Sequence, residues 1–451
     1  MDKSQLDDNF IEAGHDQPEQ HHDDYDPDHL SKNLKANWIM VVILIVAETE
    51  SSGPLSLATA VQSLGYIPGT VVLVLLGIVA GYTGVLIAEI WEKHPHVRNY
   101  DEVIEIFFGR IGKEIALWCQ IMLLWFFIAS CIMPAAQAFY VTANQSVCYV
   151  VWMIVVTIVG ILISLPRTLK GVAYISIFAV IFFLVPAIMT ITGVASQNVP
   201  LAGLPLNTSP DATITYPNSI YNIFVSINDI IFAYAGHLLF FNLILEMGNP
   251  REFKKAVILG FVINTIDYTV IGICIYAYTG IYSQSPYFLN LSTMSVQKAA
   301  FLLSVINLLI ASMNYAHLAS KNVLRRFPSL KGIAYKPGWK HWIGWVLIVS
   351  VMWIVPWIGA ELIPVFNDLI GIGGALFASQ FTYGLPCLLW ILDHRMEIRR
   401  GKYLWKFCLL ISIYLLSLLS LGVGVYSSID NIVQLRNANQ IPAPFSCSTV
   451  S

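Results

Sequence analysis

Long apolar stretches recur along this chain from Trp38 almost to the C-terminus, and polar residues gather mainly between them. A helix that spans a bilayer needs about 20 predominantly apolar residues. The pattern therefore predicts an all-α integral membrane protein with about eleven transmembrane helices. The predicted spans cover residues 37–63, 68–91, 115–142, 147–165, 170–194, 219–246, 256–281, 298–320, 341–360, 363–392 and 406–427.

The composition agrees with helices that lie in lipid. Hydrophobic residues make up 56% of the chain and charged residues 12%, whereas soluble domains contain roughly 45–50% apolar and about 25% charged residues. The spans leave no room for a separate soluble domain. We therefore expect the lipid bilayer as the surroundings of this chain and no nucleic acid as a partner.

Lysine and arginine are distributed unevenly among the loops, and this distribution predicts the orientation of the chain. Cytoplasmic loops carry an excess of these residues. With the N-terminus in the cytoplasm, 23 of the 25 Lys and Arg residues fall on the cytoplasmic side, and Lys298 and Arg436 fall outside. The Asn-x-Ser/Thr acceptors for glycosylation would then lie outside, as that modification requires: Asn144, Asn207 and Asn290.

The two terminal segments differ from the spans between them. Residues 1–36 are rich in Asp, Glu and His and lack apolar periodicity, which predicts a disordered cytoplasmic tail. Residues 428–451 are expected to form a tail on the opposite side. The histidines of the first tail have no regular spacing, so we expect no bound metal or other cofactor. Cys148 and Cys447 face the oxidising side, but the seven cysteines give no disulfide framework.

The first span is interrupted near its middle. Ten apolar residues are followed by Glu48-Thr49-Glu50-Ser51-Ser52-Gly53-Pro54, and the apolar pattern then resumes. So many polar residues at this depth must face protein or a watery cavity. Pro54 suits the first position of a new helix, and the amides of Gly53, Leu55 and Ser56 would then favour an anion such as a substrate carboxylate. The alternative is a kinked helix whose polar residues only bond to neighbouring helices.

A weaker interruption falls in the sixth span, which is the first span of a second set of five spans. Residues 233–236 read Ala-Tyr-Ala-Gly, and small residues let the backbone unwind or approach a ligand. Paired interruptions mark the substrate site in transporters built from inverted repeats. The pattern predicts a site that includes Ser51, Ser52, Gly53, Leu55, Ser56, Ala233, Tyr234 and Gly236. Small residues also mark ordinary helix packing, which is an equally good explanation for Gly236.

Four stretches of this sequence resemble the amino acid/auxin permease family, most closely its fungal neutral amino acid permeases. Residues 48–57 are similar to the family's first-helix Gly-x-Leu-Ser-Leu-Pro pattern, and residues 164–170 to its fourth-to-fifth connection. Residues 232–256 contain Phe-Ala-Tyr-Ala-Gly-His and Glu-Met-Gly-Asn-Pro-Arg-Glu-Phe, very like the family's sixth helix and following loop. Residues 363–376 are similar to its tenth helix. The likeness runs from about residue 37 to 392.

This resemblance implies a five-plus-five inverted repeat with broken helices one and six and one extra C-terminal helix. It also implies an amino acid substrate and a coupling ion that is usually a proton and sometimes sodium. Two positions depart from the family pattern. Ala58 stands where the family has a proline, and Pro54 stands where the family has an aliphatic residue with a free backbone amide. If that amide holds the substrate carboxylate in the family, this chain lacks one donor. The transporter domain would cover 37–427, with repeats at about 37–194 and 219–392 and helix eleven at 406–427.

Carboxyl groups inside the spans are the candidates for coupling to protons. Glu48 and Glu50 lie beside the first break, and two carboxyl groups in a medium of low dielectric constant retain a proton more easily. Helical geometry puts these two side chains on different faces of the helix, so only one of them would face the cavity. Asp229 lies about one turn before the sixth-helix break. Each acid could instead cap backbone or bond to a polar neighbour, and His237 is expected to be a hydrogen-bonded packing residue.

These features together predict secondary active transport of neutral L-amino acids, with protons and by alternating access. Two alternatives stay open: an amino acid sensor with little flux, and a sodium-coupled carrier in which Ser312 and carbonyl groups of the first break bind the ion. No cluster of nucleophile, acid–base or metal-binding residues indicates an enzyme, and no rings of like charge indicate a channel. The plasma membrane is favoured over the vacuolar membrane, with the N-terminus in the cytoplasm.

Overall fold

The computed structural model describes residues 36–167, 172–205, 208–214, 219–330, 332–335, 338–441 and 443–447. The predicted N-terminal tail, apart from Ala36, and the glycosylation acceptor Asn207 lie outside the described residues. Within them the chain forms helices and one isolated bridge between Ala36 and Met247. In lipid the backbone groups of a segment must pair within that segment, so apolar stretches of this length become helices. The all-α prediction is confirmed.

Each predicted span corresponds to a helical segment. The first five are α1 (Trp38–Thr49) with η2 (Gly53–Ser56) and α2 (Leu57–Leu64), α3 (Tyr66–Lys93), α4 (Tyr100–Thr142), α5 (Tyr149–Ile163) and α6 (Val172–Ser196). The next five are α7 (Ile220–Ala233) with η3 (His237–Leu239) and α8 (Phe240–Glu246), α9 (Phe253–Thr279), α10 (Met294–Arg326), α12 (Trp339–Leu362), and α13 (Phe366–Gly373) with the π-helix η8 (Gly374–Gly384) and α14 (Leu385–Asp393).

The last span and the connections complete the set of helices. Span eleven consists of α16 (Leu404–Leu419), the π-helix η9 (Ser420–Gly424) and α17 (Val425–Asn437). The connections contain η4 (Pro250–Glu252), η5 (Gly280–Tyr282), η6 (Tyr287–Asn290), η7 (Pro328–Leu330), α11 (Gly332–Tyr335) and α15 (Arg395–Arg399). Nine segments of the described chain are long and apolar enough to cross a bilayer, and α1 with the helix that follows it makes a tenth, bent by 47°. The remaining span, α5, is an apolar helix of 15 residues.

Two spans are longer than the hydrophobic pattern indicates. The segment α4 begins at Tyr100 instead of residue 115, and Gly109 forms a kink inside it with φ 67°. Span eleven ends at Asn437, so the first ten residues of the predicted tail 428–451 are helical. These residues are polar, which suggests the end of a span. They nevertheless continue the helix because α17 packs against α7 and α13.

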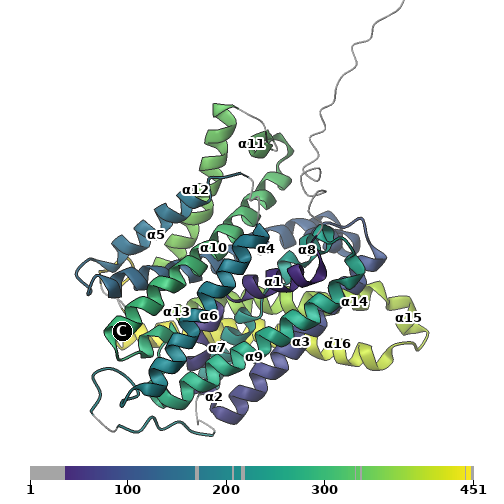
Figure 1. Ribbon diagram of the computed structural model, residues 1–451. Coiled ribbons are helices and arrows are strands. Elements are labelled where there is room, and N and C mark those ends of the chain that lie inside the picture. The colour runs from purple at the N-terminus through teal and green to yellow at the C-terminus, as the bar shows by residue number, and fades with distance from the viewer. Residues whose placement is uncertain are drawn as a thin grey trace, which may run out of the picture. The chain divides into compact units, whose positions relative to one another are not determined.

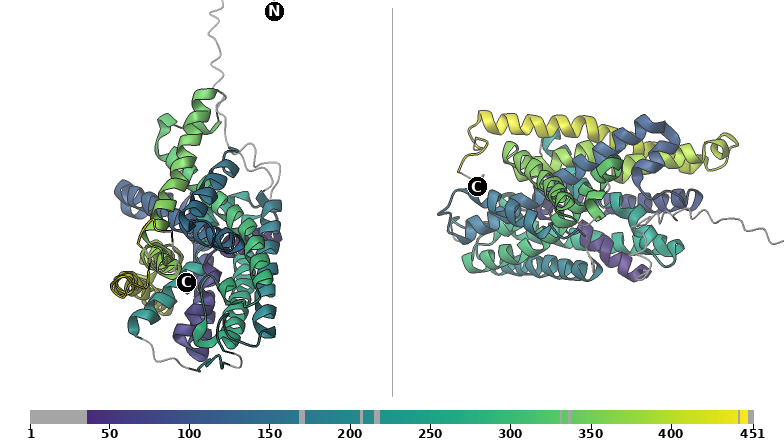
Figure 2. Two further views of the ribbon diagram at one scale, coloured as in Figure 1. Left: turned by 90° about the vertical axis from the view of Figure 1, so that its left-hand side faces the viewer. Right: turned by 90° about the horizontal axis from the view of Figure 1, so that it is seen from above.

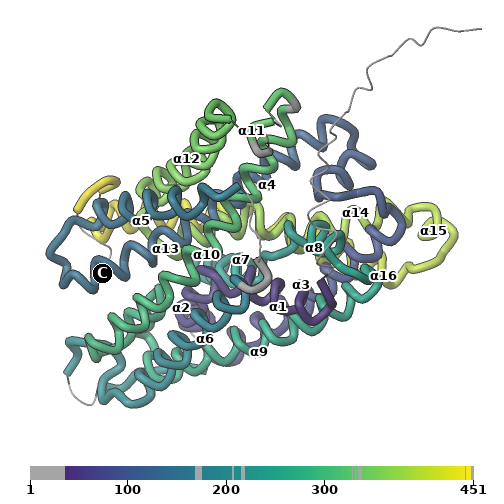
Figure 3. The backbone as a smooth tube through the Cα atoms, turned by 45° about the horizontal axis from the view of Figure 1, so that its top comes forward, coloured from purple at the N-terminus to yellow at the C-terminus, as the bar shows by residue number. Residues whose placement is uncertain are grey.

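The two broken helices lie inside the bundle. The helix α1, purple in Figures 1 and 3, packs on α9 and α6, and most of its side chains from Val41 onward are buried. The segment α2 packs on α7, α9 and α3. In contrast, α17 and α16, yellow in Figure 2, run along the edge of the bundle. Large apolar side chains such as Ile78 and Leu416 are exposed on the outer helix faces, where lipid would cover them.

The two ends of the bundle carry different residues. At one end, here named the basic end, the loops after α3, α8, α10 and α14 contain most of the lysines and arginines. At the other end, here named the disulfide end, Cys148 at the start of α5 is bonded to Cys447, 299 residues later in the chain. The sequence singled out these two cysteines as a pair facing one side but did not predict their bond. The link attaches the segment after α17, here named the C-terminal segment (residues 443–447), to α5.

Candidate functional site

The breaks in α1 and α7 meet at the centre of the bundle. The helix α1 ends at Thr49 and resumes at Gly53, and α7 ends at Ala233 and resumes after Gly236. A Cβ atom on Gly53 would lie 2.6 Å from the Cα of Ala233, and one on Gly236 would lie 3.0 Å from Cγ2 of Thr49. The two interrupted backbones therefore touch, and the approach at Gly53 leaves no space for a side chain. The structure brings the two predicted interruptions together.

One tyrosine of α9 joins the ends of both broken helices. The last carbonyl groups of a helix lack partners within the helix. The Tyr268 hydroxyl lies 2.7 Å from the carbonyl oxygen of Thr49 and 3.1 Å from that of Ala233, which are the last residues of α1 and α7. One turn earlier on α9, Asn264 donates to the Thr49 hydroxyl at 2.7 Å. These contacts hold the two breaks against α9.

Side chains of α10 bind the remaining carbonyl groups of the first break. Tyr315 donates to the carbonyl oxygen of Glu48 at 2.7 Å, and its hydroxyl lies 3.2 Å from that of Ser51. Asn307 donates to the carbonyl oxygen of Glu50 at 2.7 Å. Sequence reasoning missed these partners and Tyr268. Their signal is polar spacing within apolar spans: residues 264 and 268 are one turn apart, and 307 and 315 are two turns apart, so each pair shares a face.

The predicted substrate-binding residues take different positions. Ser51, Ser52, Gly53, Ala233 and Gly236 lie where the breaks meet, and the hydroxyl of Ser52 lies 2.6 Å from that of Ser130 on α4. The Leu55 amide donates to the Ser52 carbonyl oxygen at 3.1 Å, and the Ser56 hydroxyl donates to the Gly53 carbonyl oxygen at 2.9 Å. The Tyr234 hydroxyl points away from the breaks, towards the Leu73 carbonyl oxygen of α3 at 3.1 Å.

The predicted proton-coupling residues do not form one cluster. Glu48 lies beside the break and accepts a hydrogen bond from Asn314 at 3.3 Å. Glu50 is fully buried, and neither of its carboxyl oxygens has a hydrogen-bond partner among the described residues; Asp267 of α9 is its acidic neighbour. Asp229 lies on α7, four residues before its end, and faces Asp368 of α13. The three acids thus point to three different groups of neighbours.

The space next to the breaks is small. A cavity of about 10 Å³ is lined by Glu48, Leu124, Phe127, Ala235, Gly236, Leu238, Leu239 and Tyr315. A cavity of roughly this size holds one water molecule. The breaks are therefore closed around one another in this conformation, and a larger molecule enters only if the helices move.

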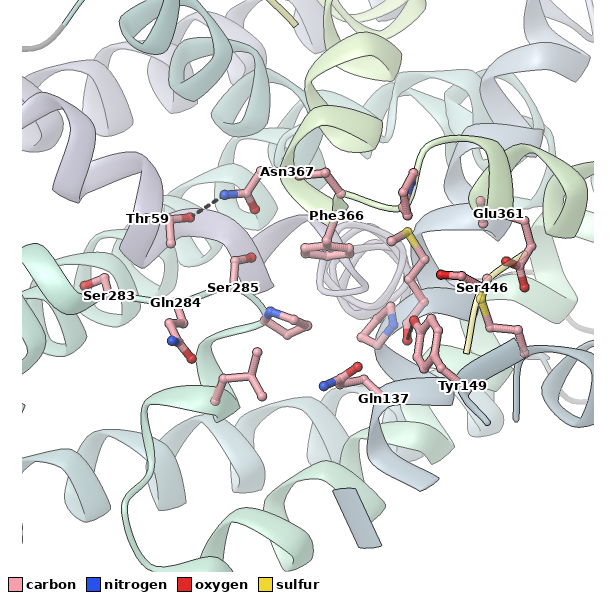
Figure 4. Close-up of a pocket in the computed structure, with 18 of the residues that line it drawn as sticks. Thr59, Gln137, Tyr149, Ser283, Gln284, Ser285, Glu361, Phe366, Asn367 and Ser446 are labelled. Carbon is pink, nitrogen blue, oxygen red and sulfur yellow. Dashed lines mark hydrogen bonds between the residues drawn. The ribbon is translucent and has the colours of Figure 1, made fainter. Parts of the chain in front are cut away.

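A much larger cavity opens between the breaks and the disulfide end (Figure 4). Its volume is about 340 Å³, and residues of α2, α4, η6, α13 and the C-terminal segment line it. Asn367 of α13 donates to the Thr59 hydroxyl of α2 across this cavity at 3.1 Å. Roughly 300–1,000 Å³ is typical of pockets for small molecules. The large cavity is thus of a size that admits a small molecule, and the residues of the two breaks are not part of its lining.

The fold and the paired breaks are those of an inverted-repeat membrane transporter. The chain is similar to a solved structure of MHP1, a nucleobase-cation-symport-1 family transporter in a closed conformation with bromovinylhydantoin bound. The TM-score is 0.57 at 12% identity, over 90% of this chain and 93% of that one. This likeness confirms the predicted fold, including the five-plus-five arrangement.

The family model for transmembrane amino acid transporter proteins matches residues 34–430, so the chain belongs to the amino acid/auxin permease family. It is 28% identical over 435 residues to the N amino acid transport system protein of Neurospora crassa, covering 93% of this chain and 90% of the relative. It is 24% identical to amino acid permease 2 of Arabidopsis thaliana, covering 93% of this chain and 92% of the relative. The chain is therefore a multi-pass membrane protein of an amino acid transporter family.

Proposed function

We propose that this chain is a secondary active transporter that carries neutral L-amino acids together with protons by alternating access. The observation that carries the proposal is the contact of the two helix breaks, Gly53 on Ala233 and Thr49 beside Gly236. Transporters of this architecture bind their substrates where the broken helices meet. The printed names of the Neurospora and Arabidopsis relatives support amino acids as the substrates.

The ends of the broken helices suit the charged groups of an amino acid. The amides of Ser52 and Gly53 lie at the positive end of the resumed helix, which favours the substrate carboxylate. The carbonyl groups at the ends of α1 and α7 accept from Tyr268 in this conformation, and the second lone pair of each remains for the substrate ammonium group. Pro54 has no amide, so one donor fewer is available than in a chain with another residue there.

Apolar side chains beside the breaks favour a neutral substrate. The ring of Phe127 lies between Phe232 and Tyr315, with centroid distances of 4.8 and 4.9 Å. Leu124 and Leu238 line the same small space. A charged substrate side chain would lose its hydration here, which is costly, and Glu48, which also lines this space, is a candidate proton carrier.

Buried carboxyl groups support protons as the coupling ion, and Glu48, Glu50 and Asp229 are the candidates. A proton carrier must take up and release its proton inside the protein, and ionisable residues within spans mark such relays. The basic end would face the cytoplasm, because Lys and Arg concentrate there, and the plasma membrane is the proposed location. A sodium-coupled carrier and a sensor with little flux are the two alternatives.

Uptake into proteoliposomes tests the proposal. Purified full-length chain is given radiolabelled alanine, leucine, phenylalanine and glutamine under an imposed proton gradient or an imposed sodium gradient. We expect accumulation with the proton gradient and its loss in a variant of at least one of the three candidate acids, Glu48→Gln, Glu50→Gln or Asp229→Asn. Accumulation with the sodium gradient alone would mean that sodium is the coupling ion. Binding without accumulation would favour the sensor.

A pair of glycine variants tests the location of the substrate site. Gly53→Ala places a methyl group 2.6 Å from the Ala233 Cα, so we expect uptake and binding to be lost. The matched control is Gly359→Ala, also in a spanning helix, where the structure places nothing within 4 Å of the new Cβ. Equal loss in both variants would show a general effect of alanine on the helices and contradict the assignment.

A further inference from the structure

A second group of buried polar side chains lies where α7, α13 and α17 meet. It contains Asp229 of α7, Asp368 of α13, and Ser428 and Asn431 of α17. The side chains of Asp229, Asp368 and Ser428 are at most 1% exposed. The helix α17 belongs to span eleven, which lies outside the two repeats of five, and its polar residues complete this group.

The partners of the two acids differ. The Asn431 amide donates to both carboxyl oxygens of Asp368, at 2.8 and 3.1 Å. Hydrogen bonds donated to a carboxylate favour its ionised form. The Asp229 oxygen Oδ1 and the Ser428 hydroxyl have no hydrogen-bond partner among the described residues. Asp368 is therefore the acid that is stabilised as an anion, and Asp229 is the acid that is not.

Gly371 of α13 lies next to both unpartnered atoms. A Cβ atom on Gly371 would lie 2.9 Å from the Ser428 hydroxyl and 3.5 Å from Oδ1 of Asp229. Both atoms thus lie on the same side of α13, but they do not bond to each other in this conformation. The Asp229 carboxyl group and the Ser428 hydroxyl therefore keep hydrogen-bonding capacity that no described partner uses.

The two carboxyl groups, Asp229 and Asp368, are expected to hold one proton between them. Two carboxylates that face each other away from water do not both ionise. Asp368 acts electrostatically on Asp229, and the neighbouring acid of α17, Asp430, accepts instead from Gln434 at 2.6 Å. The phenols of Tyr221 on α7 and Tyr426 on α17 pack against each other at 5.6 Å. Because Asn431 donates to both oxygens of Asp368, the proton that the two acids share is expected on Asp229.

We propose that Asp229 and Asp368 form the proton-binding site that couples transport, and that Asn431 of span eleven is its positioning residue. Residue 367, next to Asp368, lines the large cavity, which offers a route for protons from the disulfide end. Asp229 lies four residues before the break in α7, so a movement of α7 at the break changes its distance from Asp368. One proton is taken from water at one end and returned to water at the other, and no other bond changes.

This inference rests on the proposed function. Two measurements distinguish a wrong proton-binding site from a wrong transport function. The first is infrared difference spectroscopy of the full-length chain in lipid, titrated with acid and without substrate. We expect a band of protonated carboxyl groups at neutral pH that loses one component in Asp229→Asn and is unchanged in the control Asp430→Asn. If Asp229→Asn retains the full band, the inference is wrong, whether or not the chain transports.

The second measurement is uptake as a function of pH. We expect Asp229→Asn and Asp368→Asn to lose proton-driven accumulation of the neutral amino acids but to keep exchange of internal for external substrate. We expect Asn431→Ala to shift the pH profile upward by about one unit, because the ionised pair loses two hydrogen bonds and holds its proton more tightly. A role in packing alone would lower the rate without moving the profile. Unchanged proton-driven accumulation in both aspartate variants would reject this site and leave the proposed function standing.

Discussion

The two ends of the bundle are held together by different interactions. At the basic end, Arg325 of α10 and the buried Asp101 of α4 form an ion pair at 2.9 Å. Lys93 of α3 and Asp393 of α14 form another at 3.3 Å. At the disulfide end a neutral hydrogen bond joins α2 to α13 across a cavity of about 340 Å³.

This difference indicates which end resists opening. Removal of one partner from a buried ion pair costs roughly 3–5 kcal/mol, whereas a neutral hydrogen bond contributes about 0.5–1.5 kcal/mol. The basic end is thus the closed end of this conformation, and alternating access requires that its ion pairs separate. The Thr59–Asn367 bond has the opposite effect, because it opposes further opening at the disulfide end.

A single reporter cysteine measures both effects without a substrate. Leu239 is partly buried and lines the small cavity on the basic side of the breaks, so Leu239→Cys reacts faster with a maleimide when that end opens. Cys408, the native free cysteine that is exposed, is replaced by serine in the same background. The labelling rate then reports the population that is open at the basic end.

The largest effect is expected for Asp101→Asn. The change leaves Arg325 without its buried partner, so we expect the closed basic end to lose about 3 kcal/mol and the labelling rate of Leu239→Cys to rise steeply. Asp101→Asn combined with Arg325→Gln removes both charges, and we expect the rate to return towards that of the parent chain. Equal labelling in the parent and in Asp101→Asn would contradict the assignment of the closed end.

The next effect is expected for the disulfide. Cys148→Ser with Cys447→Ser releases the C-terminal segment, whose Phe445 packs on Trp357 at 6.1 Å and lines the large cavity. We expect the free energy of unfolding to fall by about 2 kcal/mol, and a cysteine at Gln137 in the cavity wall to react faster. Thermal unfolding and maleimide labelling measure these changes, with Cys274→Ser as the control for a cysteine that forms no bond. Unchanged labelling at Gln137 would show that the segment does not limit access to the cavity.

Sequence predicted the spans and the breaks because both follow from local rules. A bilayer demands apolar length, and a broken helix needs small or polar residues at the break itself. The partners of the breaks were not predicted, since Tyr268, Asn307 and Tyr315 come from other spans. Spacing along one helix says which residues share a face but not which helix that face meets.

The polar residues of span eleven gave a wrong boundary for the same reason. Residues 428–437 contain Ser, Asp, Asn, Gln and Arg, and hydropathy alone ends the span before them. In the fold, Asn431 meets Asp368 and Ser428 lies beside Gly371. The acid Asp368, which the sequence did not single out, becomes visible only when α13 and α17 are placed together.

A smaller effect, in the opposite direction, is expected for Thr59→Val. The change removes the hydrogen bond to Asn367 and costs about 1 kcal/mol at the disulfide end. Opening at that end is favoured, so labelling of Leu239→Cys should fall by about fivefold. Thr70→Val is the control, because the Thr70 hydroxyl bonds only within α3, to the Tyr66 carbonyl oxygen at 2.7 Å. A rise in labelling would mean that the Thr59 bond does not hold the disulfide end closed.

The smallest effect is expected at an ion pair next to the first one. Arg326 and Glu114 form a contact at 2.5 Å between the same helices, α10 and α4, but their side chains are 41% and 39% exposed. Exposed ion pairs contribute little to stability because water and salt screen them. Arg326→Gln should therefore change the free energy of opening at the basic end by less than about 0.5 kcal/mol, and the labelling rate of Leu239→Cys correspondingly little. Arg326→Gln and Asp101→Asn each remove one charge from this end. If both raise the labelling rate equally, the number of ion pairs closes the basic end whatever their burial; if only Asp101→Asn does, burial of its carboxylate is the cause.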